Sequence, residues 1–195
     1  MDAYRKKEGG FTIIELLIAM TVGLIVMSAV ISTFIIQQKT FDVQEHVTEM
    51  VQNARSAMDL MTREILMAGY NPMNAAFDGV TYNTSELKIQ ADLDGDGTAA
   101  GADEIIVYSY NSGTKQIERT TGTGGAPLPL AEDIQSFSFQ YLNGSGAATT
   151  TNADIRQVKI VITARTSKID PGYDSNGGHR TFALSSLITP KNLAF

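Results

Sequence analysis

The sequence predicts an α+β protein in which a long N-terminal helix packs on an antiparallel β-sheet head. Three observations support this prediction. Residues 16–36 form an apolar run without a charged residue, residues 37–68 continue with apolar residues at helical spacing, and residues 86–190 contain several segments in which apolar and polar residues alternate. A helix followed by antiparallel strands, each with one apolar face, packs as two layers around one core.

The composition narrows the classes of function. The chain has 195 residues, 43% apolar and 18% charged, which is typical of a folded globular protein. Its formal net charge of −6 offers no basic surface for nucleic acid, so we expect no nucleic-acid partner. Cysteine is absent, which excludes a disulfide framework and a thiolate metal site.

The first element is the apolar helix, which we place at residues 11–36. About 20 helical residues span the hydrocarbon core of a membrane, and the run contains no proline. Arg5, Lys6 and Lys7 precede it, so the positive-inside rule leaves the N-terminus in the cytoplasm. The sequence therefore predicts a single-pass protein whose head lies outside the cytoplasm.

Glu15 is an anomaly at the front of this run. A carboxylate inside a membrane costs about 3 kcal/mol or more, so it needs a partner. Cleavage after Gly10 would leave Phe11 with a free amine one helical turn from Glu15, within the chain or on a neighbouring copy. The alternative is an uncleaved signal anchor in which Glu15 reaches the membrane surface.

The basic leader, Gly10, Phe11 and the following "TIIEL" resemble the class III signal of type IV pilins and of type II secretion pseudopilins. The resemblance implies that residues 1–10 are a leader peptide and that a prepilin peptidase cuts after Gly10. The same enzyme would then N-methylate Phe11. Glu15 would dock onto the N-terminal amine of an adjacent subunit during filament assembly. Many pilins have a proline midway along this helix, whereas this sequence has only Gly23 as a weak point.

The helix is expected to continue through residues 37–68 as the first part of the head, residues 37–195. Its apolar stripe has alternating spacings of four and three, formed by Val47, Val51, Ala54, Met58, Met61, Ile65 and Ala68. Gly69 and Pro72 then provide a stop signal. Packing on the strands is the simpler use of the stripe, and a coiled coil is the alternative. We interpret the methionines as core residues rather than metal ligands.

The strands are expected between residues 86 and 190. The segments are 86–91, 104–110, 115–121, 133–142, 156–165 and 180–188. Three of their stretches, "PLAEDIQSFSFQYL", "IRQVKIVITART" and "RTFALSSLITPKNL", resemble PilW-type minor pilins and J-type minor pseudopilins. The resemblance implies a low-abundance subunit that primes filament assembly with other pilin or pseudopilin subunits. It also implies a place in the bacterial inner membrane and then in a pilus or pseudopilus.

The segment "ADLDGDGTAAGADE" is a candidate calcium loop. Asp92, Asp94 and Asp96 occupy relative positions 1, 3 and 5, and a glycine follows at position 6. Thr98 at position 7 would offer its carbonyl oxygen. Asp103 stands at position 12, where an EF-hand has glutamate, with Glu104 as a substitute ligand. The flanks are predicted strands, so this is an EF-like loop rather than an EF-hand. The alternative is a solvated acidic turn.

An enzyme is not expected, because neither His46 nor His179 stands in a catalytic motif. Three functions remain open at this stage. The first is a minor pilin that primes type IV pili, and the second is a minor pseudopilin of a type II secretion system. The third is a membrane-anchored, calcium-dependent binding module that does not polymerise.

Overall fold

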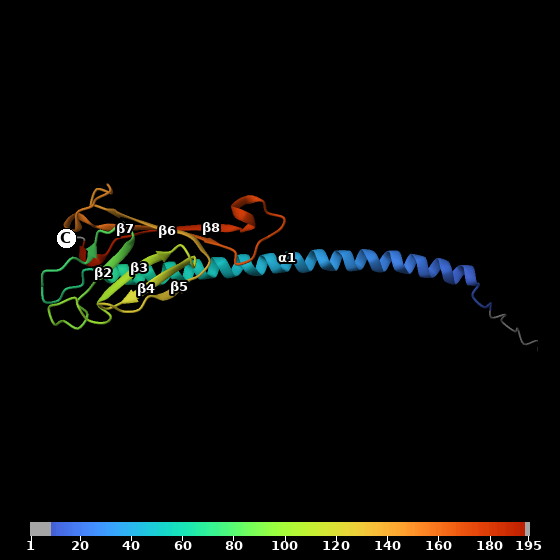
Figure 1. Ribbon diagram of the computed structural model, residues 1–195, viewed down its shortest axis with the longest axis horizontal. Helices are drawn as coiled ribbons and strands as arrows, with labels where there is room; N and C mark the ends of the chain where they lie inside the picture. The colour runs from blue at the N-terminus through green and yellow to red at the C-terminus, as the bar shows by residue number, and fades with distance from the viewer. Residues whose placement is uncertain (1–8, 194–195) are drawn as a thin grey trace, which may run out of the picture. The chain divides into compact units, whose positions relative to one another are not determined.

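The structure is a computed structural model that describes residues 9–193, so residues 1–8 of the expected leader lie outside the described residues. A single α-helix is followed by eight strands (Figure 1). The elements are α1 (Ile13–Met67), β1 (Val80–Thr81), β2 (Glu86–Gln90), β3 (Ile105–Asn111), β4 (Gln116–Thr121), β5 (Leu128–Ala131), β6 (Ile134–Leu142), β7 (Gln157–Arg165) and β8 (Thr181–Ile188). The predicted helix and all six predicted strands are confirmed to within about two residues. The short strands β1 and β5 were not predicted.

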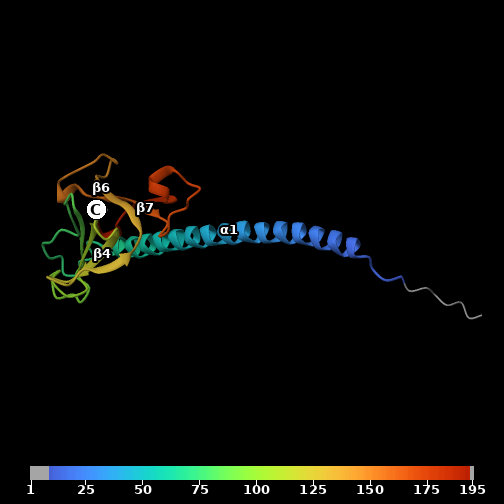
Figure 2. The same ribbon diagram turned by 45° about the vertical axis from the view of Figure 1, so that its right-hand side comes forward.

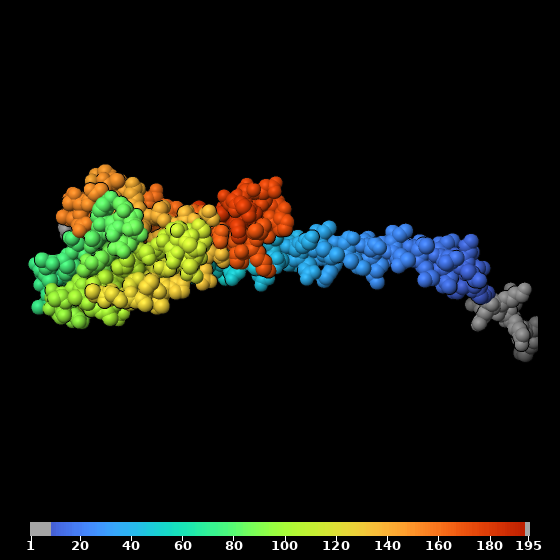
Figure 3. Space-filling view, viewed as in Figure 1, coloured from blue at the N-terminus to red at the C-terminus, as the bar shows by residue number. Residues whose placement is uncertain are grey.

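The chain forms two compact units, Met1–Gln44 and Glu45–Phe195. In the first unit every described residue from 9 to 42 is exposed, and Figure 3 draws this part of α1 in blue to cyan. The division falls eight residues beyond Ile36, where the sequence analysis ended the apolar helix. Residues 37–44, the polar start of the amphipathic part of the helix, therefore belong to the same unit as the exposed apolar part.

The second unit contains two antiparallel sheets, with strand orders β1-β2-β3-β4-β5 and β6-β7-β8 (Figures 1 and 2). In both sheets each strand pairs antiparallel with the next one in the chain. One sheet was expected from the sequence. The strands instead divide into two sheets, with β5 and β6 at separate edges that do not pair with each other.

The core of the second unit lies between α1 and the two sheets. The helix contributes the predicted stripe, of which Met61 and Ile65 are fully buried. The strands contribute alternate residues that belong to the same buried cluster, namely Leu87, Ile89, Tyr108, Ile117, Ile134, Tyr141, Val158, Ile160 and Ile162. The stripe therefore packs on strands of its own chain, which is the simpler of the two uses that its spacing allowed.

The end of α1 is fixed by the C-terminal segment. Gly69 has a φ of 76°, and a side chain there would lie 2.6 Å from Leu193 Cδ2. The Gly69 amide donates to the carbonyl of Gln90, and Asn192 Nδ2 donates to the carbonyl oxygens of Met67 and Ala68. The two Asn192 bonds satisfy carbonyl groups that a helix end leaves without partners inside the helix, and the Gly69 bond ties the end of the helix to β2.

Candidate functional sites

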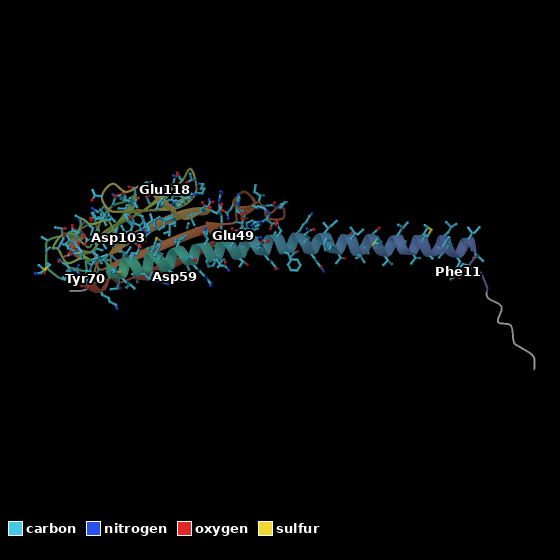
Figure 4. All side chains as sticks on the ribbon, turned by 90° about the horizontal axis from the view of Figure 1, so that it is seen from below. Phe11, Glu49, Asp59, Tyr70, Asp103 and Glu118 are labelled. Atoms are coloured by element: carbon cyan, nitrogen blue, oxygen red, sulfur yellow. The ribbon has the colours of Figure 1, made fainter. Side chains whose placement is uncertain are left out.

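The first site is the segment that leads into α1. Gly10 has no regular secondary structure, and a side chain added there would meet no other atom within 4 Å. Phe11 is 86% exposed at the start of the helix (Figure 4). Exposed backbone outside regular secondary structure is where peptidases usually cut a chain. Gly10 and Phe11 both lie in such a segment.

Thr12 and Glu15 form a helix cap that the sequence analysis missed. The Glu15 amide donates to Thr12 Oγ1 at 3.3 Å, and the Leu16 amide donates to the Thr12 carbonyl at 3.1 Å. Thr-x-x-Glu is the sequence signature of a capping box and could have identified this cap. Glu15 also lies in the first turn, where the helix dipole favours a negative charge. Local helix electrostatics thus support a carboxylate at this position.

The helix that follows is long and apolar enough to cross a membrane. Its most apolar 18-residue window has a mean hydropathy of 2.4, and none of that window is buried within the chain. Large apolar side chains are exposed on every side of the helix. They are Ile13, Ile14, Leu16, Leu17, Ile18, Met20, Val22, Leu24, Ile25, Val26, Met27, Val30, Ile31, Phe34, Ile35 and Ile36. A helix that is apolar all round needs a surrounding of lipid or of other apolar helices.

The second site is the acidic loop between β2 and β3. Asp92 is fully buried, and its two carboxylate oxygens accept hydrogen bonds from the amides of Gly95 at 2.7 Å and Gly97 at 3.1 Å. Both glycines have positive φ, 78° and 83°, which lets the backbone turn around the carboxylate. The loop is therefore folded around Asp92.

Asp94 and Asp96 are exposed beside Asp92, and one carboxylate oxygen from each of the three residues lies within 4.8 Å of the others. Carboxylate oxygens at this spacing are the ligand type that Ca²⁺ prefers. Thr98 donates both its amide and its hydroxyl to Asp96 Oδ1. Asp103, the expected ligand at position 12, is exposed (Figure 4) and does not belong to this group of three.

Glu104 has a different role from the one the sequence suggested. Its side chain is only 5% exposed, and each carboxylate oxygen accepts two backbone amides. Oε1 accepts from Leu93 and Asp94, and Oε2 accepts from Ala100 and Gly101. These hydrogen bonds, led by the one from Gly101, hold the pKa of Glu104 below its ordinary value. Glu104 thus organises the loop through its amides rather than lying with the three aspartates.

The N-terminal site has a recognised counterpart among known protein families. Residues 5–31 match the family described as the prokaryotic N-terminal methylation motif. The chain carries a class III prepilin signal. The methylation motif includes Gly10, Phe11 and Glu15, which are the three residues that the sequence analysis selected. The head lies outside the match.

Among solved structures, the chain is similar to a type IV-like pilin from Thermus thermophilus. The identity is 16%, the TM-score is 0.46, and the similarity covers 74% of this chain and 98% of that chain. None of the curated proteins compared with the chain matches it. The methylation motif is consequently the finding on which a functional argument can rest.

The head contains a polar cluster that was not predicted from the sequence. Glu64 of α1 accepts hydrogen bonds from Arg119 Nη2 at 2.7 Å and Arg119 Nε at 3.2 Å, and also from the Tyr108 hydroxyl. Burial and the Glu64 carboxylate raise the pKa of Tyr108 far above its ordinary value. Because these residues join α1 to β3 and β4, we interpret the cluster as a structural link within the head.

The two histidines make local contacts. His46 Nδ1 lies 3.3 Å from Ser167 Oγ and 3.5 Å from a carboxylate oxygen of Glu49. His179 Nδ1 lies 2.6 Å from the Thr166 carbonyl oxygen. The Ser167 contact joins His46, and the Thr166 contact joins His179, to the start of the segment that connects β7 with β8. Both histidines therefore have a place in the packing of that connection.

Proposed function

We propose that the protein is a minor type IV pilin that primes pilus assembly, cut by a prepilin peptidase after Gly10 and N-methylated at Phe11. The observation that carries this proposal is the methylation motif at the start of a helix whose first part, up to about Phe41, leaves its apolar surface uncovered. A structural, non-catalytic subunit accounts for both features. The residues that would carry the function are Gly10, Phe11 and Glu15.

The chemistry of assembly follows from these residues. Before assembly, lipid of the inner membrane covers the apolar helix, and the head lies outside the cytoplasm. In a filament, helices of neighbouring pilin subunits replace the lipid. The Glu15 carboxylate then pairs with the methylated amine of a neighbouring Phe11, which offsets the cost of keeping either charge in an apolar layer.

The alternative is a minor pseudopilin of a type II secretion system, which would use the same N-terminal chemistry. A clean deletion, scored in parallel for surface pili and for proteins released into the medium, separates the two functions. We expect loss of pili with normal secretion. Loss of secretion with intact pili would establish the pseudopilin instead. If both survive, the protein is a membrane-anchored binding module.

Replacing Glu15 tests the docking role. Glu15→Ala should leave the protein in the membrane at normal abundance, because the change makes the helix more apolar. Its amount in sheared filaments should fall strongly, because the neighbouring amine loses its partner. Glu49→Ala is the matched control, since Glu49 is an exposed carboxylate farther along the same helix. Incorporation of Glu15→Ala at the wild-type level would disprove docking.

We also propose that the acidic loop binds calcium through Asp92, Asp94 and Asp96, with the Thr98 carbonyl and Asp103 as the further ligands that the sequence suggested. The support is that one carboxylate oxygen from each of the three residues lies within 4.8 Å of the other two. Calcium binding to the native state alone stabilises it by about 2.7 kcal/mol when calcium is at 100 times its Kd. Asp94→Ala should therefore lower the midpoint of thermal unfolding of the full chain in calcium and not in chelator.

The control for this test is Asp59→Ala, which removes an exposed carboxylate from α1, away from the loop. An equal effect of Asp94→Ala in calcium and in chelator would show that the loop is an acidic turn. A bound calcium ion would stabilise a loop that has no disulfide to restrain it.

A further inference from the structure

The two sheets of the head end in four edge strands, and three of them are protected. β1 has two residues, and β5 has four residues including Pro129. The edge of β6 is covered at one end by the Tyr110 hydroxyl, whose single proton has the carbonyl oxygens of Ile134 at 2.8 Å and Gln135 at 2.9 Å as acceptors. At its other end, Leu142 forms a bridge with Ala148. Short length, proline and such covering keep an edge from pairing with another chain.

The fourth edge, β8, has none of these protections. Its sequence, TFALSSLI, contains no charge, proline or glycine over eight residues. It pairs with β7 from Arg165↔Thr181 to Val158↔Ile188 without a shift in register. A long, regular and uncharged edge strand is a template for an additional strand.

The register shows which backbone groups of β8 point outward. The Thr166 amide donates to the Arg180 carbonyl at 2.8 Å, so this pair is a hydrogen-bonded one. Hydrogen-bonded pairs alternate along an antiparallel ladder. The backbone groups of Phe182, Leu184, Ser186 and Ile188 therefore face β7, whereas those of Thr181, Ala183, Ser185 and Leu187 face away. Within residues 9–193, no backbone hydrogen bond joins these outward groups of β8 to any other segment.

The side chains define what can pair here. Phe182 and Leu184 belong to the core face of the sheet but stay half-buried, because no strand lies beyond them. Ala183, Ser185 and Leu187 are exposed on the opposite face. An added strand would complete the hydrogen bonding and cover Phe182 and Leu184. The added strand is thus expected to be an extended, uncharged segment with apolar residues at alternate positions.

A second copy of β8 paired antiparallel does not fit this edge within a filament. β8 starts opposite Arg165, near Ser167, which contacts His46, and it ends near Asn192, which contacts the carbonyl of Met67. β8 therefore runs in the same direction as the α1 residues on which the head packs. Two copies of β8 paired antiparallel would turn these helices in opposite directions, whereas subunits of one filament share one direction.

We propose that β8 is an acceptor edge onto which a different subunit of the same filament adds an extended, uncharged strand. This proposal rests on the function proposed above. The added strand pairs with the outward amides and carbonyls of Ala183, Ser185 and Leu187. It joins the two heads through main-chain hydrogen bonds.

The test uses the full chain in producing cells and compares three variants in sheared filaments. Ser185→Pro removes an outward N–H and fills its place with the proline ring, which edge strands tolerate and an added strand does not. Ser185→Val keeps the N–H. Ala183→Lys keeps the backbone and adds a charge at the edge. We expect Ser185→Val to incorporate like wild type, and the other two to fall at least about tenfold while staying in the membrane at normal abundance.

Thermal unfolding of each purified full-length variant checks that the head remains folded, and Ala183→Lys decides the question if Ser185→Pro does not fold. Wild-type incorporation of Ser185→Pro or Ala183→Lys would overturn the proposal. A dimer of the chain itself that Ser185→Pro abolishes would also overturn it.

If wild type is absent from filaments, the proposed function fails. Strand addition is then judged by amide exchange of residues 181–188. Slower exchange in native membranes than in the purified chain supports it, and equal exchange refutes it.

Discussion

The two halves of α1 belong to one helix but have opposite surroundings. From Ile13 to about Phe41 every residue is exposed, although most of these residues are apolar. From Glu45 to Met67 the sequence is more polar, yet Met50, Ala54, Ala57, Met58, Met61 and Ile65 are buried. Hydrophobicity therefore does not by itself show which half stabilises the fold. The apolar surface of the first half is left free to contact lipid or neighbouring helices. The second half instead buries a narrow apolar stripe in the core of the head.

The largest expected effect separates the two halves by function. Gly10→Val should abolish processing, because the prepilin peptidase needs a small residue before the cleaved bond. The head should stay unaffected, since a side chain at Gly10 meets no other atom. Mass spectrometry of the membrane-bound chain would show the leader still attached, and thermal unfolding would match wild type. A mature chain of normal mass starting at Phe11 would contradict the prediction.

The next prediction compares the effect of replacing a methionine in each half of α1. Met61 is 0% exposed and Met20 is 59% exposed. Met61→Ala should destabilise the head by about 3 kcal/mol, from lost burial and the cavity left behind. That loss corresponds to roughly 6–12 °C in the midpoint of thermal unfolding. Met20→Ala should change it by less than about 0.5 kcal/mol.

Both methionine variants are measured as full chains in the same detergent. Equal effects would mean that the first half of α1 also packs on the head, and the contrast between the halves would be lost.

The smallest expected effect concerns Glu104 and its pH dependence. The pKa of Glu104 is lowered from its ordinary value of 4.5, so the stability it contributes is present above pH 4.5 and is lost as the pH falls below that value. Glu104→Gln should lower the midpoint of thermal unfolding at pH 7, because an amide group would face two backbone amides. The difference from wild type should shrink toward pH 3.

Asp59→Asn is the matched control for this variant, because Asp59 is an exposed carboxylate on α1 and is not part of the amide cluster. A difference between wild type and Glu104→Gln that is as large at pH 3 as at pH 7 would show that shape, not charge, makes Glu104 important.

In the acidic loop, the sequence predicted the grouping of three aspartates but not the surroundings of Glu104. The spacing of Asp92, Asp94 and Asp96 was enough to place their carboxylates together, because a short turn with two glycines brings alternate residues to one side. The spacing could not show that Glu104 is enclosed by amides from both ends of the loop. That arrangement depends on the path of the loop between β2 and β3, and the sequence of its fourteen residues, 91–104, does not fix that path.

The sequence by itself determined the methylation motif, the helix and the long strands, because each depends on residues that are close together in the chain. Period and composition are local properties, and so is a cleavage signal. Only the tertiary structure decided that the strands divide into two sheets, that Glu64 meets Tyr108 and Arg119, and that β8 is left as an open edge. These features depend on which distant segments become neighbours, and pairing energies distributed over many residues decide that choice.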